Sequence, residues 1–235
     1  MNGVVISDSG PRRAGLLGAG SIAALGIGAV LILLLQFIPP TDEISALHQT
    51  ISEYGLSQNR WIFNVAVLLI VAGSVAGFGA LRPRRAIPTV SLIFGALWTV
   101  GLLVVVAFPK HDWATGPQAG FGGTLHRYAS VVAFACLPVA VLCAVGPAFP
   151  TSIAARRPAR ILAIAALCWF GVILGAVVIT GGHAWWQLIP LGLVERGMAA
   201  TELLALAALL AGTWRRFDGA PVLDPAAREF TAAAG

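Results

Sequence analysis

The stretch AGLLGAGSIAALGIGAVLILLLQF, residues 14–37, contains no charged side chain. A helix of about 20 predominantly apolar residues is long enough to cross the hydrocarbon core of a bilayer. The stretch is too long for the apolar region of a signal peptide, and no convincing cleavage site follows it. We therefore expect it to be retained as a membrane-spanning helix.

The composition of the whole chain supports a membrane environment. Of its 235 residues, 58% are hydrophobic and only 11% are charged, and the mean hydropathy is +0.86. A soluble domain carries about 25% charged residues, so this chain has too little polar surface to cover a globule in water. The net charge of +5 does not indicate nucleic acid as a partner, because the arginines stand in short clusters between apolar runs.

Six segments of the chain have the length and apolarity of a spanning helix. Their approximate ranges are 14–37, 61–81, 86–108, 128–146, 161–181 and 193–214. Only the sixth is interrupted by charges, at Glu195, Arg196 and Glu202. The predicted fold class is all-α, a polytopic membrane protein built as a bundle of six transmembrane helices.

The distribution of basic residues predicts the orientation of the bundle. Eleven of the fifteen basic residues lie in the termini and in the second and fourth loops, and lysine and arginine are enriched on the cytoplasmic side of membranes. Both termini are therefore expected in the cytoplasm. The abundance of Ala and Gly, and fourteen arginines against one lysine, suggest a GC-rich bacterial genome and hence the plasma (inner) membrane.

This topology divides the chain into three parts. Residues 1–13 form a cytoplasmic N-terminus, residues 14–214 form the membrane domain, and residues 215–235 form a cytoplasmic tail. The tail is rich in Ala, Pro and charge, a composition typical of disorder.

The polar segment DEISALHQTISEYG, residues 42–55, falls in the first of three outer loops. The chain's four histidines all lie on this outer side, as do five of its acids, and each outer loop contains both residue types. These residues are His48, His111, His126, His183, Asp42, Glu43, Glu53, Asp112 and Glu195.

One interpretation of these residues is a metal site. His126, His183 and Glu195 open or close predicted spans, so they could coordinate zinc at one depth and activate water for hydrolysis. The sequence has no HExxH or other tight ligand spacing. We therefore expect no cofactor, and keep zinc as an alternative.

A second interpretation is a pocket for a lipid headgroup or a small polar ligand. Ionisable residues at membrane depth are costly and point to function. Glu202 lies about two turns inside the sixth segment, on the same helix face as Glu195. We expect a partner such as His126 or Arg127 to offset the burial of Glu202.

A third interpretation is structural. Thr50 and Glu53 are spaced as a capping box for a short outer helix that ends near Gly55. His48 and His111 then belong to solvated loops, and His183 precedes two tryptophans that favour the membrane interface.

Small residues are expected to serve packing. Two GxxxG motifs, at 73–77 and 171–175, permit close approach of helices. The three cysteines all lie in apolar runs, where free cysteine packs as a small apolar residue. They are Cys136, Cys143 and Cys168.

Other cofactor classes fit poorly. Bis-histidine haem in a bundle needs ligands within facing spans, whereas the histidines here gather at one end. The sequence also lacks the CxxC spacing of thiol redox enzymes and the GxxxxGK[ST] loop that cradles phosphates.

Several short segments resemble a known family. The order of spans, an Ile51–Ser52–Glu53 segment after the first, Asn59 before the second, and Gly-Leu-Val-Glu-Arg at 192–196 are similar to the bacterial membrane family called domain of unknown function 998 (DUF 998). The resemblance covers about residues 14–214. It implies a six-span bundle with no established activity, and favours as functional positions Ser52, Glu53, Glu195 and Arg196.

The leading hypothesis is a non-enzymatic membrane protein whose outward-facing pocket binds a lipid or a small polar ligand. The candidate ligand-binding residues are Glu53, His126, Arg127, His183, Glu195, Arg196 and Glu202. The alternatives are a membrane-embedded, metal-assisted hydrolase and a scaffold subunit that packs against a membrane-protein partner.

Overall fold

Every regular element in the described part of the chain is a helix. The computed structural model describes residues 9–82, 87–111 and 120–218, and within them the chain forms six α-helices and three short 3-10 helices. The α-helices are α1 (Ser9–Leu34), α2 (Arg60–Leu81), α3 (Thr89–Ala107), α4 (Phe121–Ala148), α5 (Ile153–Ile179) and α6 (Leu191–Asp218). The 3-10 helices are η1 (Thr41–Glu43), η2 (Ile51–Leu56) and η4 (Trp185–Gln187).

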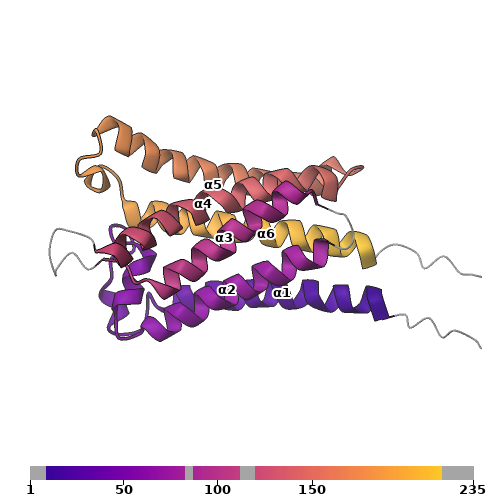
Figure 1. The fold of residues 1–235 in the computed structure, drawn as a ribbon, viewed down its shortest axis with the longest axis horizontal. Coiled ribbons are helices and arrows are strands. Elements are labelled where there is room, and N and C mark those ends of the chain that lie inside the picture. The colour runs from indigo at the N-terminus through magenta and orange to yellow at the C-terminus, as the bar shows by residue number, and fades with distance from the viewer. Residues whose placement is uncertain (1–8, 83–86, 112–119, 219–235) are drawn as a thin grey trace, which may run out of the picture.

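Consecutive α-helices run in opposite directions along the long axis of the molecule (Figure 1). The first residues of α1, α3 and α5 therefore lie at the same end as the last residues of α2, α4 and α6. We call this the arginine end, and its described basic residues include Arg82, Arg156, Arg157 and Arg160. We call the opposite end, where the other connections lie, the histidine end, and it holds His48, His111, His126 and His183.

Five of the described helices, α1 to α5, are long and apolar enough to cross a membrane. The chain is therefore a multi-pass membrane protein, as its composition predicts. The sixth predicted segment does form a helix, but α6 is not one of these five. It packs against α5, α4 and α1, and its residues Met198, Leu206 and Leu209 are buried by them.

Small and branched apolar residues fill the centre of the bundle. On α4, the completely buried residues Leu137, Ala140 and Ala144 belong to the same core as Leu206 and Leu209 of α6. Alanine side chains leave room for neighbouring leucines, because close packing requires large and small groups to alternate.

The first GxxxG motif packs as predicted. A Cβ atom on Gly73 would lie 2.9 Å from the carbonyl oxygen of Ser21, and one on Gly77 would lie 2.8 Å from Leu210. The Ser21 hydroxyl donates a hydrogen bond of 2.5 Å to the Gly73 carbonyl, which joins α1 to α2. Gly73 leaves room for the backbone of α1, and Gly77 leaves room for the side chains of Ser21 and Leu210.

The second motif does not pack within the described chain. A Cβ atom added to Gly171 or Gly175 on α5 would have no neighbouring atom within 4 Å, and Cys168 on the same helix is exposed. The predicted packing role of Cys168 and of this motif is therefore wrong for the described chain. The reason is that the buried residues of α5, such as Ala159, Ala163 and Ala166, lie on another face of the helix.

Helix boundaries differ from the predicted ranges mainly by extension. Helix α1 begins at Ser9 rather than near residue 14, and α4 begins at Phe121 rather than near residue 128. Helix α6 continues to Asp218, a few residues past the predicted start of the tail at residue 215. The predictions for residues 1–8 and 219–235, and for Asp112, fall outside the described residues.

The contrast between the two GxxxG motifs can be tested. The variant Gly73→Leu is expected to lower the free energy of unfolding by about 1–3 kcal/mol, the usual cost of overpacking. The matched control Gly175→Leu should unfold like the wild type, because its side chain enters open space. Thermal unfolding of the purified proteins in detergent measures both, and equal melting temperatures for the two variants would contradict the packing role of Gly73.

Candidate functional site

The Arg196 side chain holds the first loop of the histidine end against α6. Its Nη1 donates hydrogen bonds to the carbonyl oxygens of Gln49 (2.7 Å) and Ala46 (3.2 Å), residues far away in sequence. The same nitrogen also contacts the Gly192 carbonyl at 3.2 Å. A guanidinium offers five N–H donors in a fixed plane, so a single side chain can bind several carbonyls of a loop.

The other guanidinium nitrogen binds side chains of the same loop. Nη2 of Arg196 donates to the Tyr54 hydroxyl (2.9 Å) and lies 3.4 Å from Oε1 of Gln36. The Tyr54 hydroxyl in turn donates to Gln36 (2.8 Å), whose amide nitrogen donates to the Ile44 carbonyl (3.0 Å). Tyr54 is only 1% exposed. The sequence makes Arg196 a candidate ligand contact, but its donors bind the protein itself.

Glu195 holds the start of η2. Its Oε2 accepts a hydrogen bond of 2.9 Å from the backbone N–H of Ile51, the first residue of that helix. The predicted capping box is wrong, because the Thr50 side chain makes no cap hydrogen bond. The short outer helix is confirmed, but a carboxylate from α6 satisfies its N-terminus, where negative charge is favourable.

Glu53 forms an ion pair with Lys110 instead of a cap. The ammonium of Lys110 also donates to Oγ1 of Thr50 (3.0 Å), which lies 3.1 Å from the Ser52 hydroxyl. Lys110 follows the end of α3, so this pair joins the first loop to the connection between α3 and α4.

His126, in the second turn of α4, is buried, with an exposed fraction of only 5%. Its Nδ1 lies 2.8 Å from the carbonyl oxygen of Phe108. Its Nε2 is buried and has no hydrogen-bond partner among the described residues. The expected pairing of His126 with Glu202 is therefore wrong, because the ring is held by the end of α3 instead.

Two adjoining cavities lie beneath the first loop. The larger, which we call the polar cavity, has a volume of about 290 Å³. It is lined by Ser52, Gly55, Arg60, Phe63, Asn64, Val105, Val106, Pro109, Lys110 and His126.

The smaller, which we call the apolar cavity, has a volume of about 80 Å³. Ser52, Phe63 and Val105 line both cavities, so the two adjoin. The other residues that line the apolar cavity are Ile32, Ile51, Val67, Ile70, Trp98, Leu102, Ser130, Ala133, Phe134, Glu195, Ala199 and Leu203.

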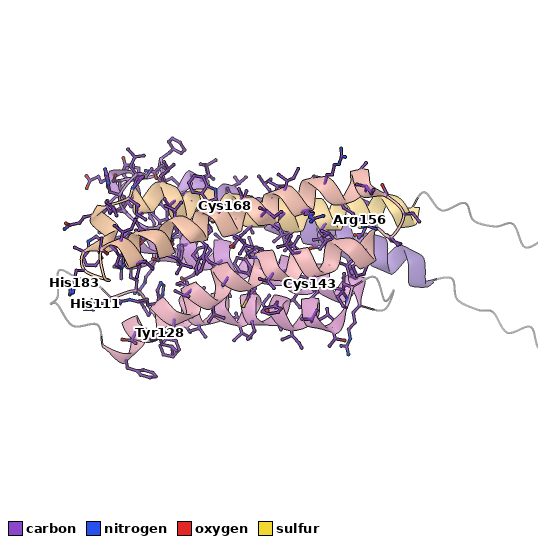
Figure 2. All side chains as sticks on the ribbon, turned by 90° about the horizontal axis from the view of Figure 1, so that it is seen from above. His111, Tyr128, Cys143, Arg156, Cys168 and His183 are labelled. Carbon is purple, nitrogen blue, oxygen red and sulfur yellow. The ribbon has the colours of Figure 1, made fainter. Side chains whose placement is uncertain are left out.

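Three sequence candidates lie away from the polar cavity. Glu202 is completely buried in α6 and lines neither cavity, and neither carboxylate oxygen has a partner among the described residues. Arg127 is exposed on α4, and His183 is exposed between α5 and η4. Figure 2 shows His183 and His111 at the histidine end, opposite Arg156.

The residues considered for zinc are not brought together. No group of three or more His, Cys, Asp or Glu side chains in residues 9–82, 87–111 and 120–218 is placed to hold a metal ion. His126 is buried against Phe108, His183 is exposed, and Glu195 is bonded to Ile51.

Sequence reasoning missed three polar residues of the polar cavity: Arg60, Asn64 and Lys110. Arg60 and Lys110 are two of only four basic residues on the predicted outer side, and Lys110 is the chain's single lysine. That rarity is a signal that could have identified them. Ser52, which the family resemblance favours, does line both cavities.

Because Arg196 holds the first loop against α6, replacing it should lower the stability of the protein. The variant Arg196→Gln is expected to lower the free energy of unfolding by about 1.5–3 kcal/mol, because it leaves loop carbonyls and Tyr54 without a charged donor. A glutamate-specific protease should then cut faster after Glu43 and Glu53 in the loosened loop. The control Arg157→Gln changes an exposed arginine at the other end. Unchanged cleavage in Arg196→Gln would show that the loop is held by other contacts.

Of the comparisons with known proteins, one identifies a family. Neither a curated protein nor a solved structure matches the chain. The family described as protein of unknown function (DUF998) matches residues 22–212, which reach into all six α-helices and include every residue of the two cavities. The resemblance seen in the short sequence segments is thereby confirmed, and the chain belongs to the DUF998 family of proteins of unknown function.

Proposed function

We propose that this chain is a six-span protein of the bacterial inner membrane whose polar cavity opens outward and binds a lipid or a small polar ligand. Helix α6 supports the sixth span by its length, since its 28 residues extend about 42 Å at 1.5 Å per residue. It also runs alongside the other five helices from one end of the molecule to the other (Figure 1).

The distribution of arginines supports the outward direction of the cavity. Arg82, Arg156, Arg157 and Arg160 all lie at the arginine end, together with the described ends of the chain (Figure 1). Basic residues are enriched on the cytoplasmic side of the membrane. The histidine end, with the polar cavity, then faces the outside of the cell.

The observation that carries the binding proposal is the buried ring of His126 in the wall of the polar cavity. Its Nε2 has no partner among the described residues. A buried polar atom without a partner costs about 1–3 kcal/mol, so a ligand toward which the His126 ring turned its Nε2 would recover that loss. A cavity of about 290 Å³ is close to the lower end of the usual range for small-molecule sites.

Binding rather than catalysis fits the chemistry of the lining. The acids nearest the polar cavity already have partners, Glu53 with Lys110 and Glu195 with the Ile51 N–H. Ser52, Asn64 and His126 offer neutral hydrogen-bonding groups around the space. These polar groups share the wall with apolar side chains such as Phe63 and Val106, and a binding pocket uses a few such polar groups to fix the orientation of its ligand.

Filling the cavity should abolish retention of a ligand. In the variant Val106→Trp an indole ring occupies the polar cavity, which Val106 lines. We expect native mass spectrometry of the full-length protein, purified from its host membrane, to show an adduct that this variant has mostly lost. The matched control Val100→Trp lies on the same helix at a position that is 54% exposed, and should keep the adduct. Equal adducts in both variants would place the ligand elsewhere.

The orientation can be tested by cysteine labelling in cells. In a background without the three native cysteines, His48→Cys is expected to react with a membrane-impermeant maleimide in intact cells. Arg157→Cys should react only after the membrane is permeabilised, because it lies at the arginine end. Reaction of both positions in intact cells, or of neither, would contradict the proposed topology.

A further inference from the structure

The polar cavity has an excess of positive charge. Arg60 and Lys110 line it, and no acidic residue does. Glu53 neutralises part of the Lys110 charge through their ion pair. The exposed Arg60 side chain has no ion-pair partner within the described chain. A group that binds here therefore gains most if it carries negative charge and accepts hydrogen bonds.

The apolar cavity extends the same space toward the middle of the bundle. Ser52, Phe63 and Val105 belong to both walls, and the deeper wall adds side chains such as Val67 and Ile70. A small soluble anion would make no favourable contact with such an apolar wall. An apolar chain attached to the anion would fill it and remove that apolar surface from water.

The depth of the two cavities matches the layers of a membrane. Arg60 is the first residue of α2, and Lys110 comes shortly after the end of α3, so both lie at the level where spans end. Ile70 lies ten residues further along α2, which is about 15 Å deeper. Charged groups are tolerated near the ends of spans and disfavoured in the middle.

We infer that the ligand is an anionic amphiphile, whose phosphate or carboxylate head lies between Arg60 and Lys110 in the polar cavity and whose hydrocarbon chain places its first few carbons in the apolar cavity. The inference rests on the proposed function, because it specifies the ligand of the same pocket. The neutral groups of Ser52, Asn64 and His126 complete the contacts to the head.

Three probes distinguish the contribution of the anionic head to binding from that of the hydrocarbon chain. Lysophosphatidic acid with an oleoyl chain has both, monooleoylglycerol has the same chain without the phosphate, and glycerol 3-phosphate has the head alone. With the full-length protein in a non-ionic detergent, we expect native mass spectrometry to show the tightest binding for lysophosphatidic acid. The variant Arg60→Gln should weaken that binding about tenfold, the effect of one lost charge-assisted hydrogen bond. Its binding of monooleoylglycerol should not change.

Two controls address charge and placement. Arg160→Gln removes an exposed arginine at the arginine end and should leave all three affinities unchanged. A brominated acyl chain should quench the fluorescence of Trp98, which lines the apolar cavity, and the variant Trp98→Phe should lose that part of the quenching.

The outcomes distinguish this inference from the proposed function. Equal binding of lysophosphatidic acid and monooleoylglycerol, unaffected by Arg60→Gln, would overturn the anionic head while the pocket stands. Glycerol 3-phosphate binding as tightly as lysophosphatidic acid would overturn the amphiphile and show a soluble anion as the ligand. Absence of binding by every probe would overturn the inference, and an adduct equally present in Val106→Trp and Val100→Trp would overturn the pocket itself.

Discussion

The cavities exist because two adjacent residues of α6 hold the first loop in place. Arg196 binds carbonyls and the Tyr54 hydroxyl of that loop, and Glu195 binds the N–H that begins η2. These contacts position Ser52 and Gly55 over the bundle as part of the cavity wall. The loop also places Ile51 and Tyr54 in an apolar cluster, so packing and polar contacts together determine its position, and polar contacts are strong where water is scarce.

The helices and their grouping by end could be predicted from the sequence. Spans are long, apolar and separated by charged loops, so composition alone locates them to within several residues. The boundaries could not be predicted, because residues such as Phe121 and Ser9 extend helices through local backbone bonds that hydropathy does not report. Hydropathy also did not report the surroundings of α6, which was predicted as a sixth span but is not among the five described helices that are apolar enough to cross a membrane. Much of α6 is surrounded by protein, so Glu202 is buried within the bundle while Glu195 and Arg196 bind the first loop.

The sequence indicated which residue types gather at the histidine end, but not how they pair with one another. Glu53, Glu195, Arg196 and His126 do lie near one another around the first loop, as the outer clustering of polar residues implied. Their partners were not predictable, because three of them bond to backbone atoms, which every residue possesses. Glu202 shows the same limit. Glu202 is buried, as its position inside the sixth segment predicted. The residues expected to offset its charge, His126 and Arg127, do not bond to it, and both its oxygens are without a partner in the described chain.

Glu53 and Glu195 are bonded within the protein, and this affects the charge that the polar cavity offers to a ligand. Counting charges at the histidine end suggests a balance of acids and bases, and hence a pocket without a preferred sign. In the structure neither acid lines the polar cavity: Glu53 pairs with Lys110, and Glu195 lines the apolar cavity, where one of its oxygens binds the Ile51 N–H. What lines the polar cavity is then one arginine, one partly neutralised lysine and three neutral polar groups. Under the proposed function, the placement of the acids outside the polar cavity leaves a positive surface that favours an anionic ligand, so the contacts that hold the loop would also influence which ligand binds.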